Sequence, residues 1–495
     1  WDIEDEIRVY GPGIDMGCDE YNPGVVDTDG DLLSDTEEGS YGSTIDAVDT
    51  DGDGLCDGAE DLRGTSPTSA DSPPGLAVPG DYAAIQQALF FAFTGETVTV
   101  SQDTYNENLR FMGRDVVLTS TDPQDDAVVD ATLINGGSRA SVVHFGGSET
   151  AACQLTGFTI TNGSATDNGG GIAGSGTFAT LSYNTISVNT SQYAGGGIDW
   201  CDGLIHNNTL YLNESTDGNG GGISLCGGTI RNNVLVENRA DDGGGIADSY
   251  GDIHNNIVAH NTASFNGGGF YGCSGDIVNN TIVSNTATSD GGGVHQCTGI
   301  IVSCIFWDNT LGSKGAQLGN SSVPDYCAIE GWTGAGEGNI TGNPQFVNFA
   351  GRDYHLDAGA PSPCIDTGGP HPMYNDPEGT PGSAQAPALG GLRNDMGAYG
   401  GPDAAELPAI PGATAGEGEG EGEGEGGASV HTADQDADNT ISLSEALRVL
   451  QFYQSIPGYH CQDGTEDGYA TGEGDQTCAT HDADYNPANW QISQS

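Results

Sequence analysis

A repeating pattern of glycine, apolar and asparagine positions occupies residues 156–309. Each repeat holds a Gly-Gly-Gly triplet followed by an aliphatic or aromatic residue, then two further apolar positions separated by polar ones. A period of 20 to 50 residues is typical of a solenoid or a propeller. The last glycine of each triplet recurs at steps of 26, 25, 23, 24 and 24 residues, at Gly171, Gly197, Gly222, Gly245, Gly269 and Gly293.

The apolar positions form three columns in phase with the triplets. Many are β-branched and are separated by Gly, Asn and Asp, which predicts short strands rather than helices. Stacked repeats would bury one continuous core that no single repeat buries alone. The columns are Ile172, Ile198, Ile223, Ile246, Phe270 and Val294; Ile205, Ile230, Ile253, Ile277 and Ile301; and Ile186, Leu210, Leu235, Val258, Ile282 and Phe306.

Two series of asparagines keep the same phase. Stacking in register at about 4.7–4.8 Å lets each side-chain amide bond to the amides above and below it. Such ladders favour a right-handed parallel β-helix over a propeller, whose blades need longer antiparallel strands. The series are Asn162, Asn189, Asn213, Asn238, Asn261, Asn285 and Asn309, and Asn184, Asn208, Asn233, Asn256 and Asn280.

Six of the twelve cysteines also recur in phase, and a spacing of about 4.8 Å between turns lies inside the Cα window of about 4.4–6.8 Å for a disulfide. We therefore expect disulfides in an oxidising, extracytoplasmic compartment. We expect Cys18 to pair with Cys56 and Cys461 with Cys478, while Cys153 and Cys364 have no evident partner. The in-phase pairs are Cys201 with Cys226, Cys273 with Cys297, and Cys304 with Cys327.

The charge is strongly one-sided, with 71 acidic residues against 11 basic ones and a formal net charge of −60. Such a surface repels nucleic acid and anionic membranes and attracts divalent cations. No apolar run is long enough to span a membrane, so we expect no membrane insertion. The chain begins at Trp1 and shows no signal peptide, so we expect the mature form of a secreted protein.

Residues 1–75 form an acidic head with two loops that carry oxygen ligands at positions 1, 3, 5, 7, 9 and 12. This spacing suits a calcium ion, with position 7 binding through its carbonyl. The segment DTDGDGLCDGAEDLRGTSP resembles the calcium-binding thrombospondin type 3 repeats of bacterial surface proteins. The predicted ligands are Asp27, Asp29, Asp31, Leu33, Asp35 and Glu38, and Asp49, Asp51, Asp53, Leu55, Asp57 and Glu60.

Residues 76–402 form the predicted β-helix. Asp81 is the expected N-cap of a helix in which Tyr82, Ile85, Leu89 and Phe93 share a face and cover the first turn. The region resembles the secreted pectin-lyase-like β-helix superfamily, in which such a helix caps the N-terminal end. The fold class is therefore all-β, a right-handed parallel β-helix with small calcium-binding modules at both ends. A loop-rich C-terminal cap is expected to use Phe346, Tyr354, Leu356 and Tyr399.

Residues 403–429 contain five Glu-Gly pairs and predict a flexible linker. Residues 430–495 resemble a dockerin, with one complete EF-hand loop and a second that stops before its closing glutamate. We expect calcium in both loops, and another surface to complete the second. The predicted ligands are Asp434, Asp436, Asp438, Thr440 through its carbonyl, Ser442 and Glu445, and Asp484, Asn486 and Asn489.

The β-helix shows no catalytic pattern of the kind that its resemblance implies. Lyases of that superfamily use a basic side chain beside calcium, and no two basic residues here recur in phase. The hydrolases use clustered aspartates, but the pair Asp241 and Asp242 suits a glycine turn. His206 and His254 share a phase in the repeat, and stacked polar residues on a solvent-exposed face explain this better than a pair of metal ligands. The basic residues are Arg110, Arg114, Arg139, Arg231, Arg239, Lys314, Arg352 and Arg393.

These patterns predict a non-catalytic, secreted, calcium-binding structural or adhesive protein. Its C-terminal module is expected to join chains head to tail into filaments or a surface layer, or to bind another extracellular protein. The alternative is a β-helix that binds or degrades polysaccharide through exposed aromatic residues such as Tyr193, Trp200, Tyr271 and Trp307.

Overall fold

The structure is a computed structural model of the chain, and it describes residues 26–29, 33–52, 57–69, 76–311, 317–360, 362–413, 459–461 and 469–471. Contacts divide the chain into two units, 1–416 and 417–495. In the second unit, the described residues form an antiparallel pair of strands, β39 (Tyr459–Cys461) and β40 (Tyr469–Thr471).

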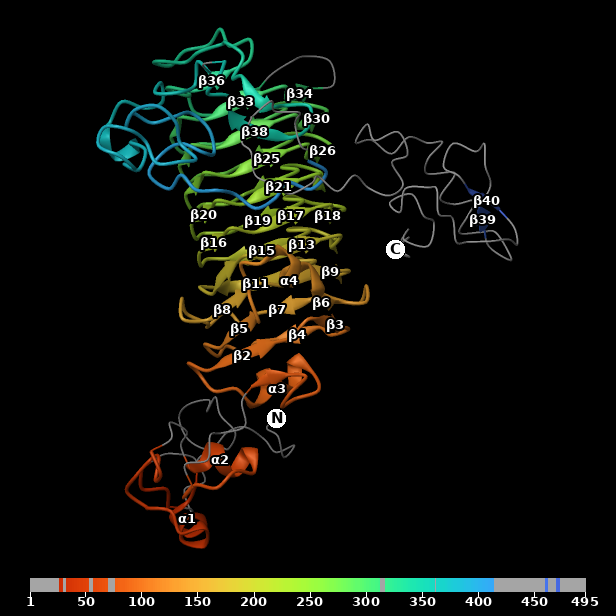
Figure 1. Cartoon of the computed structure of the whole chain (residues 1–495), viewed down its shortest axis with the longest axis vertical. Coiled ribbons are helices and arrows are strands. Elements are labelled where there is room, and N and C mark those ends of the chain that lie inside the picture. The colour runs from red at the N-terminus through yellow and green to blue at the C-terminus, as the bar shows by residue number, and fades with distance from the viewer. Residues whose placement is uncertain are drawn as a thin grey trace. The chain divides into compact units, whose positions relative to one another are not determined.

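The first unit contains a right-handed parallel β-helix with four strands in each complete turn (Figure 1). Consecutive turns stack in chain order, so every sheet pairs strands from neighbouring turns. Sheet A contains β1 (Ala77–Val78), β2 (Thr97–Val100), β5 (Val117–Ser120), β8 (Gln154–Thr156), β12 (Thr180–Ser182), β16 (Ile205–His206), β20 (Ile230–Arg231), β24 (Ile253–His254), β28 (Ile277–Val278) and β32 (Ile301–Val302). Sheet B contains β3 (Asp103–Tyr105), β6 (Thr132–Asn135), β9 (Thr159–Thr161), β13 (Thr185–Ser187), β17 (Thr209–Tyr211), β21 (Val234–Val236), β25 (Ile257–Ala259), β29 (Thr281–Val283), β33 (Ile305–Trp307) and β36 (Ala328–Ile329).

The other two sheets complete each turn. Sheet C contains β4 (Leu109–Arg110), β7 (Val143–His144), β11 (Ile172–Thr177), β15 (Ile198–Cys201), β19 (Ile223–Ser224), β23 (Ile246–Ala247), β27 (Phe270–Tyr271), β31 (Val294–His295) and β35 (Leu318–Gly319). Sheet D contains β10 (Ser164–Ala165), β14 (Thr190–Ser191), β18 (Glu214–Ser215), β22 (Arg239–Ala240), β26 (Thr262–Ala263), β30 (Thr286–Ala287) and β34 (Thr310–Leu311). The prediction of a right-handed parallel β-helix is confirmed.

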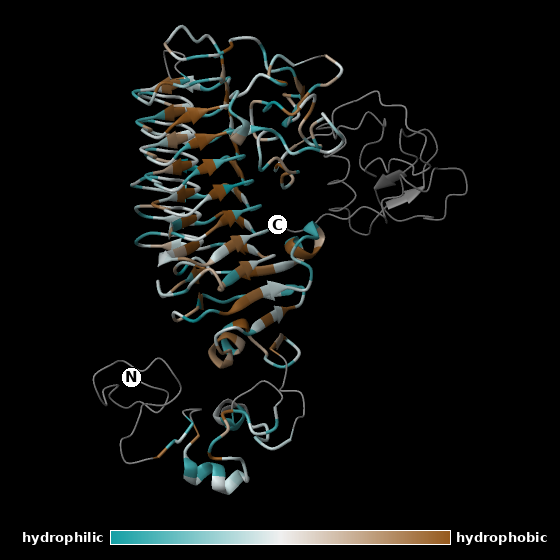
Figure 2. Ribbon diagram, turned by 90° about the vertical axis from the view of Figure 1, so that its left-hand side faces the viewer, coloured by the Kyte–Doolittle hydropathy of each residue, from teal (hydrophilic) through white to brown (hydrophobic). Residues whose placement is uncertain are grey.

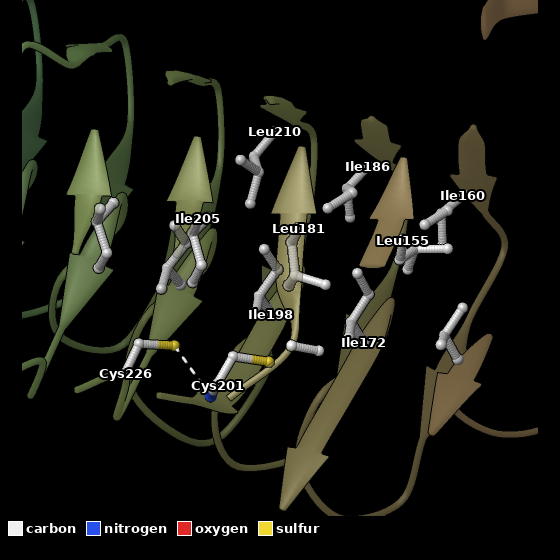
Figure 3. Close-up of a cluster of buried hydrophobic side chains, with 14 of the residues drawn as sticks. Leu155, Ile160, Ile172, Leu181, Ile186, Ile198, Cys201, Ile205, Leu210 and Cys226 are labelled. Carbon is white, nitrogen blue, oxygen red and sulfur yellow. Dashed lines mark hydrogen bonds between the residues drawn. The ribbon is translucent and has the colours of Figure 1, made fainter. Parts of the chain in front are cut away.

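The three predicted apolar columns are confirmed as the inward positions of sheets C, A and B. Ile172 pairs with Ile198, and Ile198 with Ile223, in register. These side chains are fully buried, and Figure 3 shows those of several consecutive turns pointing into one core. Figure 2 shows the same pattern as hydrophobic strands along the helix. Sheet D was not predicted, because its strands carry mostly Thr, Ser and Ala and lack a repeating large aliphatic position.

The asparagine ladders are formed at the bends between sheets. Asn238, which is fully buried, donates from Nδ2 to the carbonyl of Leu210 at 2.9 Å and to Oδ1 of Asn261 at 3.0 Å. The prediction that Asn162 is the first member of its ladder is wrong. Asn162 has a positive φ and lies one position before the ladder site, which Gly163 occupies and from which it donates its amide to Asn189.

The stacked cysteines are free thiols, which corrects the expectation of disulfides between turns. In parallel, in-register strands the two Cβ atoms lie side by side at about 4.8 Å, wider than the ~3.5–4.5 Å that a disulfide needs. The thiols bond to backbone amides instead, as where Cys201 N donates to Cys226 Sγ at 3.3 Å (Figure 3). Cys304 and Cys327 continue the Asn184–Asn280 ladder, because Asn280 N donates to Cys304 Sγ and Cys304 N to Cys327 Sγ.

The capping helix α3 (Ile85–Phe91) lies at the N-terminal end of the β-helix, as predicted. Its N-cap differs from the prediction: Asp81 accepts from the amide of Ala77, while the carboxylate of Glu107 accepts from the first helical amides, Ile85 N and Gln86 N, at 2.9 and 2.8 Å. The helix end is satisfied by Arg114, whose guanidinium donates to three carbonyls between residues 89 and 92.

Two further helices and the C-terminal segment complete the β-helix domain. Helix α4 (Asp126–Ala131) precedes β6, and Val129 O accepts from the Thr159 hydroxyl of β9 at 3.0 Å. The C-terminal segment contains the antiparallel pair β37 (Phe346–Asn348) and β38 (Asp353–Leu356) and the short 3-10 helix η1 (Pro372–Tyr374).

The predicted cap residues are used, but they cover a side of the β-helix as well as its end. Tyr354 and Tyr399 are buried against Val236 and Ile257 on the outer face of sheet B. Residues that follow position 402 also pack here: Leu407 and Ile410 join the same cluster, and Pro411 O accepts from the guanidinium of Arg352.

Candidate functional site

The described residues of the two predicted head loops make the same contacts. In each, the Thr at position 2 donates its amide and its hydroxyl to the carboxylate at position 9. Thr28 bonds to Asp35 at 2.8 and 2.9 Å, and Thr50 bonds to Asp57 at 2.8 and 2.6 Å. The amide at position 9 donates to the carbonyl just before each loop, from Asp35 to Val26 and from Asp57 to Val48. The sequence duplication is therefore also a structural duplication.

Each loop leads into a short helix that begins at position 9, α1 (Asp35–Tyr41) and α2 (Asp57–Arg63). Ser34 caps α1 in a reciprocal capping box with Glu37. The glutamate at position 12 therefore lies in the first turn of each helix, and both are buried: Glu38 is 0% and Glu60 is 1% exposed. Burying a carboxylate is costly unless hydrogen bonds or positive charge compensate it, so these two positions are set apart from the exposed acidic residues of the chain.

The other predicted ligands of the head are divided between described and undescribed residues. Asp27, Asp29, Asp49 and Asp51 are described, as is Leu33, which is buried. The position-5 aspartates Asp31 and Asp53, and Leu55, lie outside the described residues. Within the described ranges, no three His, Cys, Asp or Glu side chains are grouped to hold a metal ion.

The C-terminal calcium prediction falls outside the described residues in full. These are the first-loop residues Asp434, Asp436, Asp438, Thr440, Ser442 and Glu445, and the second-loop residues Asp484, Asn486 and Asn489.

Most basic side chains of the β-helix have structural contacts. Arg114 satisfies the end of α3, and Arg352 joins Glu237 to the C-terminal segment. The remaining contacts join Arg231 to Asp403, Arg239 to Glu214, and Arg393 to the carbonyls of Thr367 and Gly368.

The paired aspartates and histidines also have structural roles. Asp242 accepts from the backbone amide and the side-chain amide of Asn266, both at 2.8 Å, which holds the turn before the next glycine triplet. His206 and His254 do share a column of sheet A, but Arg231 stands between them. Burial lowers the pKa of both histidines, and the nearby Arg231 acts in the same direction.

A buried carboxylate on sheet C could not be predicted from the sequence. Asp199 of β15 is 4% exposed, and burial raises its pKa to about 7, with a hydrogen bond from Asn168 acting in the opposite direction. A single Asp after an aliphatic residue carries no signal in the sequence, because the outward positions of this column vary freely. Its neighbours in the same column, Ala173 and Ser224, offer no second acid.

A second group of buried carboxylates holds the C-terminal segment together. Asp395 accepts from the amides of Asp366 and Leu389, and Asp376 accepts from the amides of Asp395 and Gly401. Burial raises the pKa of Asp376 to about 7 and that of Asp395 to about 6. These hydrogen bonds all come from backbone amides of one loop-rich segment, so the two carboxylates act as internal braces.

The fold and these contacts define the chain as a parallel β-helix protein with an acidic, duplicated head. No protein-family model and no curated protein sequence matches it. Among solved structures, the crystal structure of pectate lyase Pel9A is similar, with a TM-score of 0.37 and 12% sequence identity over 66% of this chain and 94% of the pectate lyase chain. None of the helices in the described ranges has the length and hydropathy needed to cross a membrane.

Proposed function

We propose that the chain is a secreted, non-catalytic structural or adhesive protein whose head binds calcium. The observation that carries the proposal is the structural duplication of the head loops, which place a buried glutamate at position 12 and a braced aspartate at position 9 twice. Calcium prefers six to eight oxygen ligands supplied at this spacing. When bound, the ion supplies the positive charge that a cluster of carboxylates needs in order to pack.

The residues that would hold calcium follow from the loop positions. Asp27, Asp29 and Glu38 serve the first loop, with Asp35 positioned by Thr28 at the place that often binds through water. Asp49, Asp51, Asp57 and Glu60 are their counterparts in the second loop, with the position-5 aspartates and the position-7 carbonyls as further ligands. The formal net charge of −60 supports cation binding in general, and the repeated brace supports it at these loops in particular.

The β-helix supports a structural role because its recurring residues are used for stacking. Glycines pass close to the neighbouring turn, aliphatic residues fill the core, and asparagines and thiols bond from turn to turn. The guanidinium groups detailed above are bound to carbonyls and carboxylates. A long, regular solenoid of this kind separates its two ends by a fixed distance, which suits a spacer in an extracellular assembly.

Thermal unfolding of the full chain in calcium and in excess chelator tests the proposal. Calcium should raise the unfolding temperature of the head in the wild type but not in the double variant Glu38→Gln/Glu60→Gln. Asp46→Asn is the control, because Asp46 is an exposed head carboxylate outside the two ligand sets. Equal responses of all three proteins would refute the assignment of calcium to these loops.

We propose the C-terminal module, with its EF-hand loop ending at Glu445, as the contact that joins chains or binds another extracellular protein. Size-exclusion chromatography of the full chain with and without calcium tests self-association. Larger species that appear only with calcium and disappear in Glu445→Gln support joining of chains. A monomer under both conditions contradicts joining of chains, and the module would then bind another extracellular protein instead.

A further inference from the structure

Three exposed aromatic side chains and one carboxylate lie at the edge where the chain passes from sheet C to sheet A. Phe178 is 56%, Trp200 50% and Tyr250 51% exposed. Phe178 follows β11, Trp200 belongs to β15, and Tyr250 follows β23, so the aromatic residues come from different turns but from one edge of the β-helix. Asp202 follows β15 and stands one turn after Phe178, because its amide donates to Thr177 O at 2.7 Å.

Asp202 is held by two hydrogen bonds on the same oxygen. Its Oδ1 accepts from the hydroxyl of Tyr250 at 2.7 Å and from the amide of Gly227 at 2.8 Å. The bond to Asp202 raises the pKa of Tyr250 to about 12, and Trp200 acts in the opposite direction. These bonds join residues 25 and 48 positions apart in the sequence and fix the Asp202 carboxylate against the Tyr250 ring.

Two glycines lie against these rings, and at Gly227 an added Cβ would clash with the ring beside it. A Cβ on Gly227 would lie 2.1 Å from Cε2 of Tyr250, so only glycine leaves room for that ring. A Cβ on Gly176 would lie 3.5 Å from Cε2 and Nε1 of Trp200 and 3.8 Å from Oδ2 of Asp202. Gly176 and Gly227 are two turns apart, which is about 9.5 Å along the axis at about 4.8 Å per turn.

We propose that this edge, made of Phe178, Trp200, Asp202 and Tyr250, binds a neutral polysaccharide that lies along the axis of the β-helix. Aromatic rings with one open side offer apolar area to the C–H face of a sugar ring, and their rigid side chains lose little conformational entropy on binding. Oδ2 of Asp202 adds a hydrogen-bond acceptor for a sugar hydroxyl between the rings.

The charge of the chain selects a neutral glycan over an acidic one. A protein with a formal net charge of −60 repels a polyanion, and the edge itself contributes a further carboxylate, Asp202. A protein partner fits less well, because interfaces of usual size bury about 800 Å² on each side around an apolar centre. Between these rings the turns carry glycine and polar residues, with Leu225 as the neighbouring exposed aliphatic side chain.

This site goes beyond the proposed calcium-dependent role, because it lies on the β-helix and uses no residue of the head. It would give an extracellular rod a lateral attachment to a glycan matrix. The two ideas fail separately: chelation should leave glycan binding intact, while loss of the aromatic edge should leave the calcium response of the head intact.

Affinity electrophoresis of the full chain through gels containing hydroxyethylcellulose, xylan or glucomannan tests the inference, with polygalacturonate as the acidic polymer. At least one neutral polymer should retard the wild type, and Trp200→Ala should bind it roughly thirtyfold more weakly, the usual loss for a central aromatic anchor. Tyr250→Phe keeps the ring and should bind more tightly than Tyr250→Ala. Phe265→Ala is the matched control, since Phe265 is also 51% exposed but lies before the glycine triplet of β27.

Circular dichroism establishes that each variant is folded, and Asp202→Asn provides a second variant that keeps an acceptor for Tyr250. Weaker binding by Trp200→Ala together with wild-type binding by Phe265→Ala supports the site. No retardation of the wild type by any neutral polymer, equal retardation of Trp200→Ala, or stronger retardation by polygalacturonate would overturn it. Self-association of the wild type that Trp200→Ala abolishes would assign the edge to a second copy of the chain and would also overturn it.

Discussion

Replacing Asn238 by alanine should destabilise the β-helix far more than its small volume suggests. The Asn238 side chain makes four hydrogen bonds: two donated from Nδ2, to Leu210 O and Asn261 Oδ1, and two accepted at Oδ1, from the amide and the side chain of Asn213. All of the asparagines involved are fully buried, so water cannot replace the lost partner.

The size of the destabilisation can be calculated from the hydrogen-bond donors that the substitution leaves without an acceptor. Asn213 N and one N–H of its side-chain amide lose their acceptor, and each buried donor without a partner costs about 1–3 kcal/mol. The free energy of unfolding should therefore fall by about 4 kcal/mol, against less than about 0.5 kcal/mol for Thr262→Ala. Thr262 is the matched control because it is an exposed polar residue of sheet D next to Asn261 of the same ladder.

Urea unfolding followed by far-ultraviolet circular dichroism measures both variants. If Asn238→Ala changed stability by no more than Thr262→Ala does, the ladder would be a by-product of stacking rather than a source of stability, and the reasoning would be wrong.

Further predictions follow from backbone contacts and charge. Gly221→Ala should lower the free energy of unfolding by about 3 kcal/mol, because its Cβ would lie 2.5 Å from the backbone of Arg239 and Gly244. Gly342→Ala is the control and should change this free energy little, because its Cβ would lie at ordinary contact distance from Pro363. Equal shifts of the two urea midpoints would contradict this. Asp199 should make the β-helix less stable as pH rises: burial raises its pKa to about 7, so the folded chain binds the proton more tightly than the unfolded chain, and stability falls between about pH 4 and pH 7 by on the order of 4 kcal/mol. Asp199→Asn should flatten this part of the pH profile of the unfolding temperature, and an unchanged slope would show that Asp199 is ionised in the fold.

The parts of the fold that repeat could be predicted from the sequence. A buried column needs the same kind of side chain in every turn. Ile205, Ile230 and Ile253 therefore predict a strand at the same place in each turn, and the in-phase asparagines predict a ladder. Sheet D gives no such signal, because its residue types, such as those of Thr190 and Ser191, occur in turns as often as in strands. The ladder member Asn162 was misplaced since an asparagine beside a bend is equally suited to a positive φ.

Contacts between distant segments could not be predicted. Glu107 caps α3 from 22 residues away, and Tyr250 reaches Asp202 across 48 residues. In the head, spacing alone predicted both loops, while the burial of Glu38 and Glu60 emerged only in the folded chain. The expectation of disulfides between turns failed because a Cα distance does not contain the direction of the Cβ atoms, while Cys18, Cys56 and Cys478 of the other expected pairs lie outside the described residues.

We propose that calcium bound at the head supplies the chemistry of the chain and that the β-helix is the scaffold. Calorimetric titration of the full chain with calcium tests this claim most directly, with the wild type, Glu38→Gln/Glu60→Gln and the control Asp46→Asn compared under identical conditions. The account predicts that the double variant binds about two fewer ions per chain than the wild type, one for each head loop, and that Asp46→Asn matches the wild type. Equal stoichiometry in all three proteins, or no calcium binding by the wild type, would contradict it.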